Sequence, residues 1–110
     1  MKGSLWAVTA VLATVAVPVG AAEVEALLKS KECLTCHSID RETAAPSFQS
    51  IGRKYKGNEN AEAMLMATVM KGSPSTGGFH WGTRKMPSPS VRQAVSEEEA
   101  KQVVGWILGL

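Results

Sequence analysis

The sequence is poor in the residues that let a small domain stabilise itself. Only 5% of its 110 residues are aromatic, and its two cysteines lie within one short motif, which leaves none for a structural bridge elsewhere. The formal net charge at pH 7 is only +2, so the composition gives no reason to expect a nucleic acid as a partner. There is no internal repeat and no low-complexity segment. The length and balance therefore predict one small domain.

A short apolar run near the N-terminus predicts a signal peptide over residues 1–22. A positive charge precedes the apolar residues 5–17, and Gly20 and Ala22 stand at the small-residue positions that a signal peptidase requires. The alternative is a retained membrane anchor, but the run is short and is not followed by a basic stop-transfer cluster. Cleavage is therefore expected, which leaves residues 23–110 as one domain without an integral membrane span.

The motif that organises the mature chain is Cys33-Leu34-Thr35-Cys36-His37, which has the Cys-x-x-Cys-His pattern of c-type haem attachment. Two thiols one helical turn apart can each add to a porphyrin vinyl group. The histidine that follows is then carried beneath the iron and can ligate it through one imidazole nitrogen. With only about ninety residues left after cleavage, a core of side chains alone is marginal, and a buried cofactor would add a large apolar surface.

Three other interpretations of the motif remain open at this point. A redox dithiol would be expected within a βαβ pattern, which is missing here. A zinc site would need further ligands, but only His37 and His80 supply nitrogen and there is no second cysteine pair. A structural disulfide would make the adjacent histidine a coincidence. Haem attachment accounts for the motif and for export together.

The hydrophobic spacing predicts an all-α domain of three or four short helices. The expected helices lie at 23–31, 48–55, 61–71 and from 97 to the C-terminus. The first should run into the haem motif. Asn60 is a good N-cap and Gly72 a good C-terminal stop for the third helix, and Ser96 with Glu99 forms a capping box for the last.

The second iron ligand decides the function, because two protein ligands make an electron carrier and an open position permits reaction. The candidates are His80 and the methionines of the mature chain. Met64, Met66 and Met70 share one predicted helix, where methionine usually fills core space. Met86 lies on a long loop and is stiffened by Pro87, so the sequence favours Met86 over His80.

The chain resembles the short bacterial class I cytochromes c, over nearly all of its mature part. The residues that carry the resemblance are Cys33 to Asp40, Ala45-Pro46, Arg53 to Gly57, Lys71-Gly72-Ser73, Trp81-Gly82, Met86-Pro87, Val95-Ser96 and Trp106 to Leu108. The resemblance implies the small cytochrome c fold around one covalently bound haem c.

The resemblance also implies roles for individual residues. Cys33 and Cys36 would form the thioethers, and His37 and Met86 would be the axial iron ligands. The Pro46 carbonyl would accept the His37 ring N–H, a bond that fixes the ring and raises its basicity. The Trp81 indole would hydrogen-bond a haem propionate. The first and last helices would cross near Leu27, Leu28 and Trp106.

The expected function is electron transfer in the periplasm, where one electron passes between respiratory redox partner proteins such as a reductase, an oxidase or a dehydrogenase. A monomer is expected, and an enzyme is not, because apart from His80 no acid–base pair flanks the motif. The alternative is a haem c subunit of a periplasmic oxidoreductase complex. Arg53, Lys54, Lys56, Arg84 and Lys85 are candidates for a charged rim that steers an acidic partner.

Overall fold

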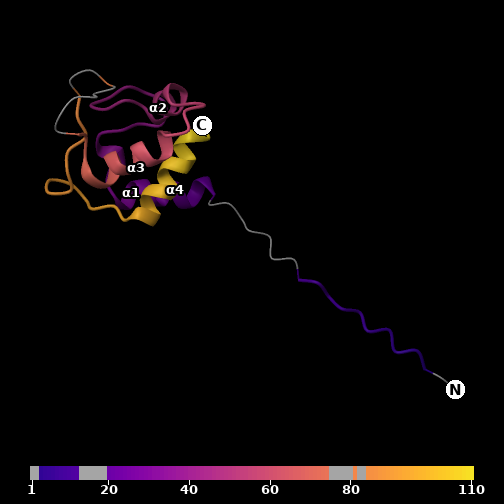
Figure 1. The fold of residues 1–110 in the computed structure, drawn as a ribbon. Helices are drawn as coiled ribbons and strands as arrows, with labels where there is room; N and C mark the ends of the chain where they lie inside the picture. Colours follow the sequence, from indigo (N-terminus) through magenta and orange to yellow (C-terminus); the bar gives the residue numbers. More distant parts are fainter. Residues whose placement is uncertain (1–2, 13–19, 75–80, 82–83) are drawn as a thin grey trace.

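The fold of residues 3–12, 20–74, 81 and 84–110 is described by a computed structural model. Within these residues all regular structure is helical, so the predicted all-α class is confirmed. The elements are the α-helices α1 (Ala21–Ser30), α2 (Phe48–Lys54), α3 (Ala61–Lys71) and α4 (Glu97–Leu108) and the short 3₁₀ helix η1 (Cys33–Thr35) (Figure 1).

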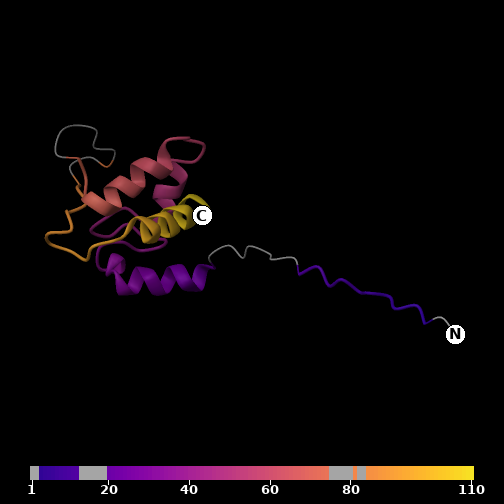
Figure 2. The same ribbon diagram turned by 60° about the horizontal axis from the view of Figure 1, so that its bottom comes forward.

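Helix α4 is the centre of the packing. It contacts α1, α2 and α3, and Figure 2 shows it lying between α1 and α3. Its start is well defined, because Ser96 Oγ accepts the Glu99 N–H and the Glu99 carboxylate accepts the Ser96 N–H, which is the predicted capping box. Three glutamates in its first turn complement the positive end of the helix dipole.

The hydrophobic core joins the two ends of the domain. Leu28 of α1 and Val104 of α4 are fully buried, and Phe48 of α2 is 3% exposed. Leu27 and Trp106, which the resemblance placed near the crossing of the first and last helices, both pack against this core. Full burial of one such aliphatic side chain is worth about 1.5–3 kcal/mol, so α1 is held mainly by its apolar face on α4.

The first helix ends earlier than expected and does not run into the motif. It begins at Ala21 and ends at Ser30, and Glu32 then adopts φ 59° and ψ 25°, in the left-handed region. A left-handed residue reverses the chain direction, so the α-helical hydrogen bonds cannot continue through it. The chain re-enters helical geometry only in η1, which starts at Cys33.

The middle helices follow the prediction closely, with one correction. Ser47 caps α2 by accepting the Ser50 N–H, and Gly72 ends α3 as expected. Asn60 occupies the N-cap position of α3, but its side chain makes no capping hydrogen bond. Instead the Asn58 side chain accepts the Asn60 N–H at 2.9 Å, so a local turn positions the helix start.

Residues 3–12 form no helix or strand, and their side chains are exposed. Figures 1 and 2 show them apart from the helical body. Among the residues that the structure describes, no helix is long and apolar enough to cross a membrane. The signal peptide over residues 1–22 and the domain boundary at residue 23 stay predictions, and cleavage after Ala22 would fall within the first turn of α1.

Candidate functional site

The two cysteines lie on one tight turn and differ in exposure. Cys33 begins η1 and packs against the hydrophobic core, whereas Cys36 is exposed, and both are free thiols. The Cys36 and His37 N–H groups both donate to the Cys33 carbonyl, at 3.3 and 3.0 Å. Burial raises the pKa of the Cys33 thiol above its ordinary value. The turn therefore presents one sulfur at the core and the other at the surface, with the histidine directly after them.

The His37 imidazole is held in one tautomer. Its Nδ1 lies 2.8 Å from the Pro46 carbonyl oxygen, which can only accept, so Nδ1 carries the proton. Burial lowers the pKa of His37, which keeps the ring neutral at pH 7. The other nitrogen, Nε2, therefore keeps its lone pair. The bond between His37 and Pro46 that the resemblance implied is present, and its consequence is a ring ready to ligate a metal.

Helix α2 fixes the orientation of that ring. Phe48 stacks on His37 with ring centroids 4.9 Å apart and an interplanar angle of 19°. Trp106 of α4 packs on Phe48 edge to face, with centroids 5.7 Å apart. Aromatic pairs of this kind contribute about 0.5–1.5 kcal/mol beyond their burial. The histidine is thus connected through two rings to the central helix.

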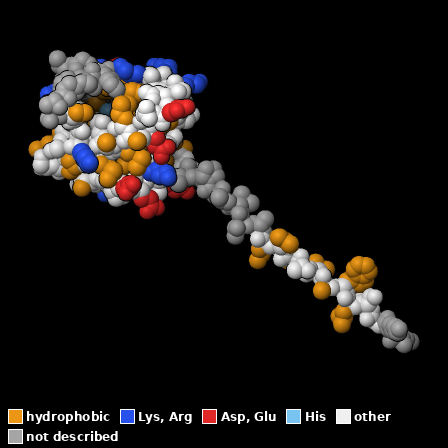
Figure 3. Space-filling view, in the orientation of Figure 1, with side chains coloured by type: hydrophobic (Ala, Val, Ile, Leu, Met, Phe, Trp, Pro, Cys, Tyr) orange, Lys and Arg blue, Asp and Glu red, His pale blue; other side chains and the backbone are white. Residues whose placement is uncertain are grey.

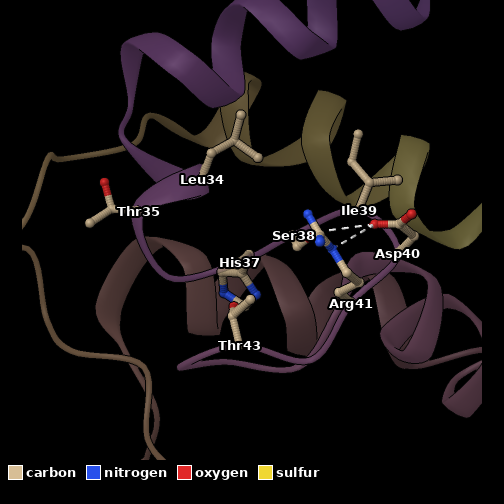
Figure 4. Close-up of a pocket in the computed structure, with 8 residues that line it drawn as sticks. All are labelled: Leu34, Thr35, His37, Ser38, Ile39, Asp40, Arg41 and Thr43. Atoms are coloured by element: carbon tan, nitrogen blue, oxygen red, sulfur yellow. Dashed lines mark hydrogen bonds and ion pairs between the residues drawn. The ribbon is translucent and has the colours of Figure 1, made fainter.

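The loop after His37 returns to the motif and delivers Pro46. Thr43 Oγ1 donates to the Cys36 carbonyl at 2.6 Å, and the Ala45 N–H donates to the same oxygen at 3.1 Å. Beside this loop is a cavity of about 400 Å³, and His37 lies on its wall (Figure 4). The cavity is lined by Leu34, Thr35, His37, Ser38, Ile39, Asp40, Arg41 and Thr43.

Met86 lies on the loop that follows α3 and is half-buried. Its backbone N–H donates to Ser73 Oγ at 2.8 Å, and its carbonyl accepts the Ser73 N–H at 2.9 Å. The rival ligand His80 lies outside the described residues. The structure therefore fixes the backbone of Met86 and leaves its thioether on a loop rather than within a helix.

Trp81 lies beside the end of α2. Its ring is half-buried, packs against the hydrophobic core and carries the Lys54 ammonium 4.4 Å from its centroid. Trp81 also hydrogen-bonds the side chain of Tyr55, whose pKa is raised by burial. The Trp81 N–H is thus engaged by the Tyr55 oxygen, and the Lys54 ammonium and the Tyr55 hydroxyl are the donors here that suit a carboxylate such as a haem propionate.

The donor set fits a covalently bound haem better than a zinc ion. Within the described ranges, no three His, Cys, Asp or Glu side chains come together in a metal-binding group. Covalent attachment of a c-type haem uses two thiols and an imidazole on one turn, which Cys33, Cys36 and His37 would supply. The haem also accepts a thioether as its second axial ligand, which Met86 would supply.

Two polar residues, Glu42 and Arg92, connect the motif side to the methionine side, and the sequence interpretation missed both of them. The Glu42 carboxylate, five residues after His37, accepts from Arg84 at 3.0 Å. Arg92 donates to the Pro87 carbonyl, and its charge also interacts with Cys33. A lone arginine within a loop of small residues is a weak signal for Arg92. No pattern in the sequence marks Glu42.

The comparisons with known proteins agree with this site. Residues 21–110 match the cytochrome c family. The chain is 37% identical over 93 residues to cytochrome c-551 of Stutzerimonas stutzeri, covering 84% of this chain and 82% of that protein. It is 35% identical over 89 residues to cytochrome c2 of Rhodocyclus tenuis, covering 81% and 94%.

Solved structures show the same fold. The crystal structure of Nitrosomonas europaea cytochrome c552 superposes with a TM-score of 0.67 at 29% identity, covering 78% of this chain and 98% of that one. The class 1 cytochrome MtoD of Sideroxydans lithotrophicus ES-1 gives a TM-score of 0.62 at 30% identity, covering 83% and 96%. The chain therefore belongs to the cytochrome c family, as a small class I member that carries one covalently attached haem c and transfers electrons rather than catalysing a reaction.

Proposed function

We propose that this chain is a periplasmic electron carrier in which His37 and Met86 are the axial ligands of the haem iron. Cys33 and Cys36 form the thioethers. The observation that carries the proposal is the hydrogen bond between His37 Nδ1 and the Pro46 carbonyl, because it leaves Nε2 free to bind a metal. When bound, the haem supplies an iron that accepts and returns one electron.

The chain contributes by keeping its ligands in place. Pro46 and Phe48 hold the His37 ring from two directions, so the imidazole does not need to reorient when the charge on the iron changes. A thioether ligand and a dry surrounding both favour the reduced state, so Met86 and the core packing raise the reduction potential. The Lys54 ammonium and the Tyr55 hydroxyl, which lie beside Trp81, would receive a haem propionate, and the ammonium would offset its negative charge.

The proposed docking face surrounds the cavity beside the motif. Leu34 and Ile39 line this cavity and are 38% and 36% exposed, which gives a small apolar centre. Lysine and arginine side chains gather along the edge of the molecule over α2 (Figure 3). Arg84 of the expected rim is paired with Glu42, which offsets part of its charge, and the cations of the rim together would steer an acidic partner. Such contacts suit brief encounters with redox proteins.

The ligand set is tested by comparing two methionine variants of the holoprotein. Met86→Leu should remove the weak far-red absorption of a ferric iron with a sulfur ligand, lower the reduction potential and allow fast cyanide binding. Met66→Leu is the matched control, because Met66 lies on α3 and lines a separate surface cavity. Retention of the far-red band in Met86→Leu would refute methionine ligation.

Location and partner chemistry need separate measurements. Export predicts that the haem-loaded chain is recovered from the periplasmic fraction, and its thiols should resist alkylation. Stopped-flow oxidation by an acidic redox protein should slow as salt rises, because the steering charges are screened. Recovery of the loaded chain only in the cytoplasmic fraction would contradict the proposed location.

A further inference from the structure

Both backbone polar groups of Met86 are bound by one residue. Ser73 donates its N–H to the Met86 carbonyl at 2.9 Å, and its hydroxyl oxygen accepts the Met86 N–H at 2.8 Å. Such a double bridge fixes the rotation of the Met86 peptide units on both sides of its Cα. The thioether can then depart only by changing its own side-chain rotamer or by breaking this bridge.

The bridge depends on a close backbone approach that only glycine allows. Gly72 has φ 90°, where L side chains are strained. A Cβ at this position would lie 2.9 Å from the Met86 carbonyl oxygen, 3.0 Å from the Pro87 carbonyl carbon and 3.0 Å from the Ser88 nitrogen. The end of α3 is therefore pressed directly against the backbone of the methionine loop.

Arg92 closes the loop from its other side. Its Nε donates to the Pro87 carbonyl, while Nη2 donates to the Val69 carbonyl at 2.7 Å and reaches the Thr68 carbonyl at 3.4 Å. Both oxygens belong to the final turn of α3, where the helix dipole favours a cation. The Thr68 carbonyl also accepts the Gly72 N–H at 2.8 Å, so the Val69 carbonyl is the main acceptor for the guanidinium. One guanidinium thus ties Pro87 to the rigid end of a helix.

We propose that Ser73 and Arg92 are positioning residues that retain the Met86 thioether on the iron. This inference rests on the proposed function, in which Met86 is a ligand. Ser73 bonds the backbone of Met86 and Arg92 bonds the carbonyl of Pro87, and neither residue acts on the thioether directly. They set how often the backbone at Met86 and Pro87 moves away from the end of α3, and so the rate at which an external ligand can replace the sulfur.

The hydroxyl of Ser73 is tested in ferric holoprotein with cyanide as the probe. Ser73→Ala loses one hydrogen bond to a backbone N–H, and a net value of about 1 kcal/mol corresponds to roughly fivefold faster cyanide binding. Exchange of the Met86 amide hydrogen should quicken by a similar factor. Ser73→Thr keeps the hydroxyl and should restore both rates. Ser90→Ala is the matched control, because the Ser90 hydroxyl is bonded to the Ser88 hydroxyl and not to Met86 within the described residues.

The guanidinium of Arg92 is tested by Arg92→Lys, which keeps the charge and loses the forked geometry. Cyanide binding should quicken by about tenfold, since contacts to more than one carbonyl are lost. The far-red sulfur band should remain at neutral pH and disappear at a lower alkaline pH than in the unaltered protein.

The outcomes separate this inference from the proposed function. If the unaltered protein lacks the sulfur band, methionine ligation and the inference fail together. If the band is present and Ser73→Ala and Arg92→Lys bind cyanide at the unaltered rate, the proposed function stands and the inference is refuted. Faster amide exchange without faster cyanide binding would also refute the inference. The contacts of Ser73 and Arg92 with the backbone of Met86 and Pro87, together called the clamp on Met86, would then be structural only.

Discussion

A single methyl group at Gly52 should weaken the contact between α2 and α4. Gly52 is buried on α2, and a Cβ there would lie 2.5 Å from the Ile107 carbonyl oxygen of α4. Overpacking against backbone that cannot yield costs up to about 3 kcal/mol. Alanine returns about 1 kcal/mol through its higher helix propensity. The net loss for Gly52→Ala is therefore about 2 kcal/mol in the free energy of unfolding.

The matched variant is Gly105→Ala, on the exposed side of α4. Apart from the chain neighbours and the backbone of α4 itself, no heavy atom of the described residues lies within 4 Å of a Cβ at Gly105, so only the propensity gain of about 1 kcal/mol applies. Thermal unfolding should show a midpoint about 8–16 °C lower for Gly52→Ala and about 4–8 °C higher for Gly105→Ala. Changes of the same sign in both variants would refute the reasoning from close approach.

The weaker packing caused by Gly52→Ala should also change the environment of the His37 ring. Phe48 lies on the same short helix and stacks on His37, so a displaced α2 carries the stacking ring with it. The NMR resonances of the His37 ring protons should therefore shift in Gly52→Ala and stay unchanged in Gly105→Ala. Unshifted His37 resonances in a destabilised Gly52→Ala variant would show that the stacking of Phe48 on His37 does not depend on how α2 packs against α4.

Two further predictions concern single residues near the motif. Glu32→Gly should raise the free energy of unfolding by about 0.5–1 kcal/mol. Relief of the left-handed backbone of Glu32 contributes about 1–2 kcal/mol, and the more flexible unfolded chain of the glycine variant offsets about 0.4–1 kcal/mol of it. Glu32→Ala keeps a Cβ, so its free energy of unfolding, measured in urea, should not rise. The pKa of Glu42 is lowered, mainly by Arg84, so its contribution is present above pH 4.5 and is lost as the pH falls through its lowered folded-state value. The difference in unfolding midpoint between the unaltered protein and Glu42→Gln should accordingly narrow on acidification, and a constant difference down to about pH 3 would contradict the assigned pair.

Much of the fold could be predicted because local signals agree with the packing. Helix α3 occupies the predicted residues, since Gly72 stops it by a conformation open mainly to glycine. The capping box of α4 was likewise readable from Ser96 and Glu99. The early end of α1 was not, because Glu32 adopts a left-handed backbone that its residue type disfavours.

The candidate site divides in the same way. The spacing of the motif alone predicts Cys33, Cys36 and His37 as site residues. The clamp on Met86 could not be predicted, because Ser73 and Arg92 act through backbone carbonyls and amides, and any residue type can lie opposite them. Contacts between a side chain and a distant backbone group produce no periodic pattern in the sequence, so they can be identified only from the folded structure.

The central position of α4 has a consequence for the order in which this molecule can mature. Among the described elements, every pairing between two α-helices includes α4, so the core closes only after α4 has been synthesised, and joining ends so far apart in sequence is entropically slow. Until then the cysteine turn belongs to an open chain, in which both thiols are accessible to a porphyrin. Assembly of the cofactor can thus precede closure of the protein around it.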